Sequence, residues 1–293
     1  MGVVWADRFI VQRLTDMVYL GIDSACSDDR IYRVARLFTA IRDFLKRLEE
    51  YYLQVDQLDT VPDSLQPNEP HPRFFPQCTQ YHCRKQNKLV NIKYTRAIDD
   101  SDPANLTYVA ETVGETPSSE VIVKFSDRYG YEPHQLLAEK GRAPELYYVG
   151  LLDGKQDVSD CEEARGSGRT CGLYNGPLRM IVMEHLDGKD AGEMEHEEWP
   201  TTAYDDVKAA VKCLHEAGFV FGDLRRPNVV FSPKTIGSDE VQAQLIDFDW
   251  AGREGEVYYP PGLSMNAGWT EGIESFKKIE KRHDMDMLAK HFG

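Results

Sequence analysis

The segment from Cys213 to Trp250 contains polar side chains whose types could support phosphoryl transfer. That reaction needs a carboxylate at the acceptor hydroxyl, a cation beside the moving phosphate, and oxygen ligands for magnesium. In chain order, the segment supplies Asp223, Arg225, Asn228 and Asp247. Asp223 and Asn228 are five residues apart, so one loop can present both side chains to a single site. Asp247 follows a short apolar strand pattern and adds a second carboxylate.

Each of these residues has a distinct expected role. Asp223 would accept or orient the proton of the acceptor hydroxyl. Arg225 keeps its charge whatever its burial, and its planar guanidinium suits phosphate oxygens. Asn228 and Asp247 would bind magnesium through oxygen atoms. A lone aspartate in a loop more often caps a turn, so the prediction depends on the combined spacing.

A lysine upstream of this segment adds a second cation. Residues 89–94, 106–111 and 121–125 are short apolar runs separated by polar turns, a pattern that predicts three β-strands. Lys124 lies within the third run. A lysine in a buried strand usually has a carboxylate or phosphate partner, since an unpaired charge there is costly. A surface lysine on an edge strand is the alternative.

Together these features resemble the protein-kinase-like superfamily. The resemblance rests on Lys124 in a strand, on Gly222-Asp223-Leu224-Arg225 in place of His-Arg-Asp, on Asn228, and on the Asp247-Phe248-Asp249 motif. The chain is most similar to compact members such as fungal kinase-like proteins and small-molecule kinases. The resemblance covers about residues 89–288. It implies an α+β fold with two lobes, a small antiparallel β-sheet lobe and a shortened helical lobe.

The resemblance also implies an activity and its cofactors. The activity is ATP- and Mg²⁺-dependent transfer of a phosphoryl group to a hydroxyl of a protein (Ser/Thr) or of a small molecule. Lys124 would contact ATP phosphates while paired with a glutamate of the following helix, Glu132 by preference and Glu139 as the alternative. A hinge formed by Met183, Glu184 and Leu186 would bind adenine through backbone groups. Asp284 would brace the catalytic loop.

Several features depart from the kinase pattern. The turn at residues 95–105 contains no glycine, although kinases use a Gly-rich loop to bring backbone amides onto the phosphates. Asp249 replaces the glycine of Asp-Phe-Gly, and it could either give a second carboxylate near the metal or face solvent. No Ala-Pro-Glu motif follows. These departures favour the alternative function, a pseudokinase or scaffold that binds a protein partner.

The N-terminal region predicts a helical hairpin from residues 6–20 and 29–55. In the second helix, apolar residues recur every three or four positions, namely Ile31, Val34, Phe38, Ile41, Leu45, Leu48 and Tyr52. We expect this stripe to pack on the catalytic domain, and a coiled coil with a protein partner is the alternative. Proline-rich sequence follows. The predicted domains are a helical segment at 1–57, a linker at 58–88, an N-lobe with hinge at 89–186, and a C-lobe at 187–293.

Composition limits the class of partner. The chain has 293 residues, 41% of them hydrophobic, which is enough for a sizeable core. Its net charge of −15 argues against nucleic acid, because phosphate backbones are bound by clustered lysines and arginines. No apolar run approaches the length of a membrane span, and the first residues do not resemble a secretory signal. We therefore expect an intracellular protein, cytoplasmic or nuclear, with reduced thiols, although a bridge between Cys161 and Cys171 stays open.

Overall fold

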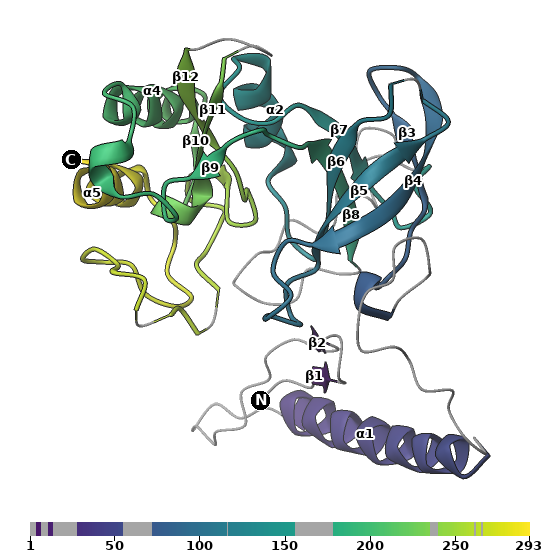
Figure 1. Ribbon diagram of the computed structural model, residues 1–293. Coiled ribbons are helices and arrows are strands. Elements are labelled where there is room, and N and C mark those ends of the chain that lie inside the picture. Colours follow the sequence, from purple (N-terminus) through teal and green to yellow (C-terminus); the bar gives the residue numbers. More distant parts are fainter. Residues whose placement is uncertain are drawn as a thin grey trace.

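The computed structural model combines an antiparallel sheet with a group of helices and short strands (Figure 1). The residues that it describes are 4–6, 11–13, 28–54, 72–115, 117–155, 178–234, 240–260, 262–264 and 266–293. The predicted α+β class is confirmed. The Cys161–Cys171 question and the first part of the predicted linker, up to residue 71, lie outside the described residues.

The larger sheet has six antiparallel strands in the order β3-β4-β5-β6-β8-β7. Their bounds are β3 (Gln80–Cys83), β4 (Lys88–Ala97), β5 (Thr107–Val113), β6 (Glu120–Ser126), β7 (Leu146–Gly150) and β8 (Arg179–Glu184). Three of these strands confirm the strand runs expected around Lys124. In β6, Val121, Val123 and Phe125 are buried in the sheet's own core. Because neighbouring side chains in a strand alternate between faces, Lys124 lies on the opposite face.

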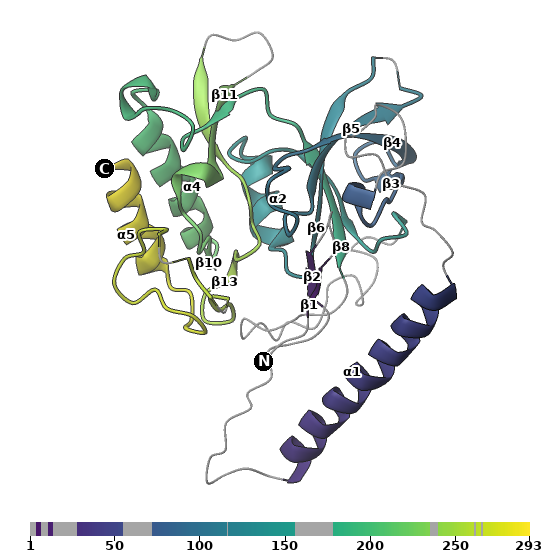
Figure 2. The same cartoon turned by 60° about the horizontal axis from the view of Figure 1, so that its bottom comes forward.

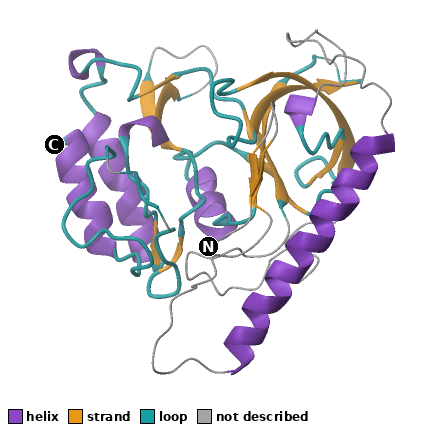
Figure 3. Cartoon of the chain, turned by 90° about the horizontal axis from the view of Figure 1, so that it is seen from below, coloured by secondary structure: helices purple, strands orange, loops and turns teal. Residues whose placement is uncertain are grey.

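The two edges of this sheet approach each other, so the sheet curves into a nearly closed ring (Figure 3). The amide of Arg84, just after β3, donates to the carbonyl of Tyr147 in β7 at 3.1 Å. The amide of His82 donates to the carbonyl of Gly154 at 2.6 Å. A Cβ on Gly154 would lie 2.1 Å from the carbonyl oxygen of Gln80, and its φ is +70°. Only glycine permits this close approach.

The ring contains a core that includes residues expected to be linker. The short 3₁₀ helix η1 (Pro72–Phe74) and strand β3 both lie within the predicted 58–88 linker. Phe74 is 4% exposed, and its ring stacks on that of Tyr94 at 5.3 Å. The linker prediction is therefore wrong for this stretch. Proline excludes regular helix, but it did not prevent Phe74 and Tyr81 from filling the sheet core.

The second part of the molecule packs helices against two small sheets. The helices are α2 (Tyr131–Glu139), α4 (Ala203–Glu216) and α5 (Lys281–Phe292). The strands are β9 (Lys189–Asp190), β10 (Phe219–Val220), β11 (Val229–Pro233), β12 (Val241–Leu245) and β13 (Gly252–Arg253). Strand β11 pairs with both β9 and β12, and β10 pairs with β13. The short 3₁₀ helices η2 (His196–Glu198) and η3 (Arg226–Asn228) connect these elements.

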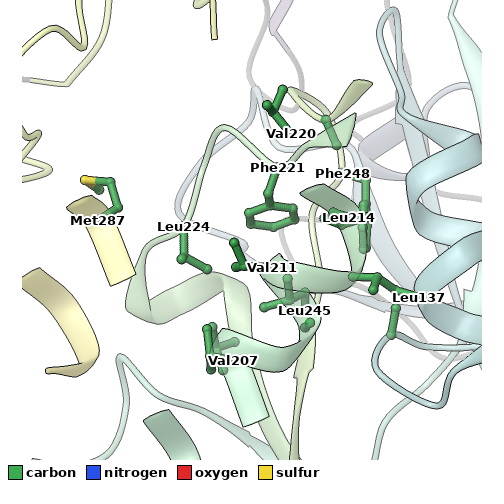
Figure 4. Packing of buried hydrophobic residues seen from close by; sticks show 14 of the residues in the cluster. Leu137, Val207, Val211, Leu214, Val220, Phe221, Leu224, Leu245, Phe248 and Met287 are labelled. Atoms are coloured by element: carbon green, nitrogen blue, oxygen red, sulfur yellow. The ribbon is translucent and has the colours of Figure 1, made fainter. Parts of the chain in front are cut away.

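Helix α4 follows directly from its sequence and leads into the candidate site. Its buried residues Val207, Ala210, Val211 and Leu214 recur at helical spacing. Asp205 and Asp206 occupy its first turn, where acidic side chains favour the helix dipole. Gly218, with φ +82°, follows its end. Figure 4 shows this buried face packed against Phe221, Leu224 and Phe248, residues of the loops that carry the candidate site.

The N-terminal prediction fails in part. Residues 4–6 and 11–13 form the antiparallel strands β1 (Val4–Ala6) and β2 (Val11–Arg13), not a helix. Three-residue strands are too short for periodicity to reveal. The second helix is present as α1 (Asp28–Gln54). Figure 2 shows it apart from the strands of the sheet, and its apolar side chains Ile31, Phe38 and Leu45 are at least half exposed. The predicted first helix is therefore wrong at residues 6 and 11–13, and its residues 7–10 and 14–20 lie outside the described residues. The expected packing of the apolar stripe of α1 on the domain is wrong for these three exposed side chains.

Within the described residues, no helix combines the length and the apolar character needed to cross a membrane.

Candidate active site

The loop that carries Asp223 is held in place from beneath by a buried carboxylate. Asp284, in the first turn of α5, is 1% exposed. Its Oδ2 accepts from the amide of Phe221 at 2.8 Å and its Oδ1 accepts from the amide of Gly222 at 2.8 Å. His215 Nε2 lies 3.0 Å from Asp284 Oδ2. Asp284 therefore contacts the backbone of the loop that it was expected to hold.

Asp223 is a buried carboxylate paired with Arg225. Arg225 donates to it twice, from Nε to Oδ1 at 2.5 Å and from Nη2 to Oδ2 at 2.7 Å. Asn228 Nδ2 donates to the carbonyl oxygen of Asp223 at 2.9 Å. Burial raises the pKa of Asp223 above its usual value, although the Arg225 guanidinium opposes the shift. The guanidinium also lies 5.1 Å from the centre of the Trp269 ring.

Lys124 joins the two parts of the molecule. Its Nζ lies 2.7 Å from Asp247 Oδ1 and 2.9 Å from Asp249 Oδ1, and its side chain is 12% exposed. Burial opposes the charged lysine, but the two carboxylates outweigh burial and raise the pKa of Lys124. Burial likewise opposes the charged form of Asp247, yet Lys124 lowers the pKa of Asp247 below its usual value. Burial raises the pKa of Asp249 to about 7.

Asp247 also adopts a rare backbone conformation. Its φ is +64°, in the left-handed region that costs a non-glycine residue about 1–3 kcal/mol. The neighbouring Phe248 is fully buried, and its ring meets that of Phe221 edge to face at 5.3 Å. The buried Phe248 ring therefore holds the backbone of Asp247 in this conformation. In it, the Asp247 carboxylate lies against Lys124.

The two loops are joined by backbone and by charge. The amide of Ile246 donates to the carbonyl of Asn228 at 3.0 Å. The charge of Asp247 acts to raise the pKa of both Asp223 and Arg225. The structure therefore brings together the five side chains that the sequence singled out for phosphoryl transfer, namely Lys124, Asp223, Arg225, Asn228 and Asp247.

The predicted partner of Lys124 on helix α2 is wrong. Glu132 lies in the first turn of α2, where its Oε1 is 3.6 Å from Arg253 Nη2 and its side chain is 46% exposed. Glu139, the alternative, accepts a hydrogen bond from Gln135 on the exposed face of the helix. Neither glutamate makes an ion pair with Lys124. Asp249 is the carboxylate that pairs with Lys124 in addition to Asp247. Its position two residues after Asp247 could have suggested this pairing.

Sequence reasoning also missed His134 on the buried face of α2. Its ring stacks on Phe248 at 4.5 Å with an interplanar angle of 2°. One ring nitrogen lies 2.5 Å from the Tyr129 hydroxyl and the other 2.8 Å from the Pro144 carbonyl. Burial lowers the pKa of His134 to about 4, so the ring is neutral at physiological pH. No sequence pattern identified this residue, because the contact depends on where α2 packs.

The turn without glycine is held by a buried arginine. Arg73 is 5% exposed. Its Nη2 donates to the carbonyls of Asp99 at 2.7 Å and Asp102 at 3.1 Å. Its Nη1 donates to the carbonyl of Asn105 at 3.1 Å and lies 3.3 Å from the Tyr108 hydroxyl. These bonds fix the turn between β4 and β5, the position of the phosphate loop in the kinase resemblance.

The expected hinge residues contribute to the core and to a cavity next to it. Met183 is 6% exposed and packs in the core. Glu184 accepts a hydrogen bond from the amide of Glu145 at 3.0 Å. Glu184 and Leu186 line a cavity of about 880 Å³ that Lys124, Asp223, Asn228 and Asp247 do not line. Adenine binding by Met183, Glu184 and Leu186 therefore stays a prediction.

The donor set suits magnesium. Asn228 donates from its amide nitrogen to the Asp223 carbonyl, and this contact leaves its amide oxygen free of that bond. The Asp247 carboxylate lies on the segment that is bonded to Asn228 through the backbone. Hard cations such as Mg²⁺ prefer such oxygen donors. Among the described residues, no group of three or more His, Cys, Asp or Glu side chains is arranged to hold a metal ion by itself. A magnesium ion here would need further oxygen ligands, such as those of a bound phosphate.

Comparison with known proteins gives a structural likeness only. No protein-family model matches the chain, and no curated protein matches it. The structure is similar to that of the kinase PK-1 from Cydia pomonella granulovirus, with 13% sequence identity and a TM-score of 0.37. The match covers 56% of this chain and 55% of that chain, so it spans about half the length of the viral kinase.

Proposed function

We propose that this chain is an ATP- and Mg²⁺-dependent phosphotransferase of the protein-kinase-like superfamily. Its acceptor would be a hydroxyl group on a protein serine or threonine or on a small molecule. The observation that carries the proposal is the 2.7 Å contact between Lys124 Nζ and Asp247 Oδ1, residues 123 positions apart in the chain. The loop bearing Asp223 and Asn228 is bonded directly to the Asp247 segment.

The residues of the site have complementary roles in this reaction. Bound Mg²⁺ would neutralise charge on the β and γ phosphates. Asp247 and Asn228 would hold it through their oxygen atoms, and Lys124 would contact the phosphates. Arg225 would neutralise charge on the transferring group. Asp223 can bind the acceptor hydroxyl while paired with Arg225, because a carboxylate has about four lone-pair sites.

Transfer of labelled phosphate from ATP tests this proposal. The acceptors would be an arrayed Ser/Thr peptide library and a panel of small amino alcohols. Asp223→Asn removes the proton acceptor, and a positioned general base contributes about 10²- to 10⁴-fold to rate. We expect a loss of that size, with unchanged activity in the control Asp286→Asn, which alters an exposed carboxylate of α5. Equal activity of wild type and Asp223→Asn would remove Asp223 from the mechanism.

A scaffold or pseudokinase that binds a protein partner is the second candidate, favoured by helix α1. Ile31, Phe38 and Leu45 share one face at a spacing of seven residues and are 57%, 50% and 56% exposed. A seven-residue apolar repeat is the pattern of a coiled coil. The fixed turn held by Arg73 fits the same reading, since it offers no glycine-rich loop to a nucleotide.

The two candidates predict different results. A scaffold predicts no thermal stabilisation by magnesium and ATP. It also predicts a complex, or a self-associated chain by sedimentation equilibrium, that the double variant Phe38→Ser/Leu45→Ser dissociates. An exposed polar control, Thr39→Ser on the same helix, should leave that complex intact. Nucleotide stabilisation of a chain that stays monomeric would contradict this candidate.

A further inference from the structure

Lys124 has two carboxylate neighbours, and both come from one three-residue segment. Asp247 Oδ1 lies 2.7 Å and Asp249 Oδ1 lies 2.9 Å from the lysine Nζ. The Asp249 side chain is 27% exposed and that of Lys124 is 12% exposed. One ammonium thus faces two carboxylates, and of these two only Asp247 is a metal ligand in the proposed function.

Helix α2, in contrast, presents no carboxylate to the lysine among its described residues. Glu132 is directed to Arg253, and Glu139 accepts from Gln135. The buried side of the helix presents His134, whose ring is occupied by the stack on Phe248 and by its two hydrogen-bond partners. The buried face of α2 therefore presents a neutral ring and not a carboxylate.

The segment that carries Asp249 is fixed on both sides. The amide of Gly130 donates to the carbonyl of Phe248 at 2.9 Å. Arg128 Nη2 donates to the carbonyl of Trp250 at 3.2 Å. A Cβ on Gly130 would lie 2.5 Å from the carbonyl oxygen of Ala251. The backbone at Gly130 is therefore packed directly against the backbone at Ala251. Asp249 thus lies on a rigid support, as a group that positions another side chain must.

The charge balance indicates what happens when the site is filled. An ammonium has three N–H donors. If the Asp247 carboxylate coordinates Mg²⁺, Lys124 loses one of its two partners. A charged lysine that is buried without any partner is strongly disfavoured. Asp249 remains, so the lysine stays charged and in place while its other donors face the phosphates.

We propose that Asp249 is the positioning residue of Lys124, in the role that the kinase resemblance gives to a helix glutamate. The inference rests on the proposed function, and it adds a specific consequence. The lysine is held by the segment that also carries the metal ligand, so its position does not depend on any movement of α2. Substitution of the α2 glutamates then leaves the lysine in place.

A double-mutant cycle on the ligand-free protein tests the pairing. Unfolding by urea at pH 8 would be measured for wild type, Lys124→Met, Asp249→Asn and the double variant. A direct pair gives non-additive effects, because contacting residues couple and distant ones do not. We expect coupling of at least tenfold in the unfolding equilibrium constant. The matched cycle of Lys124→Met with Glu132→Gln should be additive to within twofold. Additive effects for Lys124 and Asp249 would overturn the proposal.

Nucleotide titration distinguishes a positioning residue from a metal ligand. Calorimetry with a non-hydrolysable ATP analogue and Mg²⁺ would be run on the same four proteins. If Asp249 acts through the lysine, Asp249→Asn should weaken binding of the analogue at least tenfold when Lys124 is present. The same substitution should weaken it less than twofold in the Lys124→Met background. The Mg²⁺ concentration for half-maximal binding should stay unchanged.

The remaining outcomes are equally decisive. If Asp249→Asn raises that Mg²⁺ concentration equally in both backgrounds, Asp249 is a metal ligand and the proposal is wrong. If wild type binds no magnesium nucleotide, the proposed phosphotransferase function fails. The unfolding cycle still decides whether Asp249 holds Lys124 in that case.

Discussion

Replacing Asp284 with alanine would remove the acceptor that holds the Asp223 loop in place. The carboxylate receives the amides of Phe221 and Gly222, each at 2.8 Å, and it lies 3.0 Å from His215 Nε2. It is 1% exposed, so water cannot replace it without a local opening. Gly222 has φ +84° and a Cβ there would lie 2.9 Å from Ile279, so the loop has little room to find another path.

The expected magnitude follows from these contacts. A buried donor left without its acceptor costs about 1–3 kcal/mol. Asp284→Ala leaves two buried amides without acceptors, so the variant should lose about 3 kcal/mol of unfolding free energy. That is a large share of the roughly 5–15 kcal/mol typical of a folded domain. At about 2–4 °C per kcal/mol for a large domain, Tm should fall by roughly 6–12 °C.

Urea unfolding and phosphoryl transfer would be measured on Asp284→Ala and on the control Asp286→Ala. Asp286 lies on the same helix but is exposed. The control should change the unfolding free energy by less than about 0.5 kcal/mol, as exposed substitutions usually do. Activity per folded molecule should fall in Asp284→Ala alone, because Asp223 would lose its orientation. If the two variants lose the same stability and activity, the bracing role is wrong.

Three further predictions concern the surroundings of the site. The pKa of His134 is lowered to about 4 by burial, so the unfolded chain binds the extra proton as pH falls below about 6.5. The contribution of His134 to stability should therefore fall by about 2 kcal/mol between pH 8 and pH 5. In urea unfolding, the stability difference between wild type and His134→Gln should change with pH by that amount; a difference that does not depend on pH would contradict it. Arg73→Met removes three bonds to backbone carbonyls, at a cost of about 2–4 kcal/mol, and limited proteolysis should then cut the turn at residues 98–106; resistance equal to wild type would count against it. Gly130→Ala forces apart backbone now in contact with Ala251, so we expect a loss of about 1–3 kcal/mol; a neutral effect in thermal unfolding would show that this contact relaxes freely.

The sequence was informative where function depends on local spacing. The loop from Asp223 to Asn228 is short, so the residue interval lets one loop carry both side chains, and Asn228 bonds the Asp223 carbonyl. Asp247 follows a strand that pairs with the strand after Asn228, so it too is positioned within one small sheet. Lys124 was predictable because a charged residue among buried strand neighbours requires a partner.

The sequence was less informative where the outcome depends on how distant elements pack. Glu132 matched the expected helix position, but the entry angle of α2 directs it to Arg253. Which carboxylate reaches Lys124 is decided by the backbone contact of Gly130 with the Phe248 segment. The four contacts of Arg73 likewise join residues at least 26 positions away. No local pattern encodes such pairs.

The central claim is that the Lys124 and Asp247 cluster binds a magnesium nucleotide, and equilibrium binding of a fluorescent ATP analogue tests it most directly. Binding would be measured with and without Mg²⁺ for wild type, Asp247→Asn and the exposed control Asp286→Asn. We predict saturable binding that requires Mg²⁺, at least tenfold weaker in Asp247→Asn and unchanged in the control. Absence of binding by wild type, or equal affinity in all three proteins, would contradict the claim.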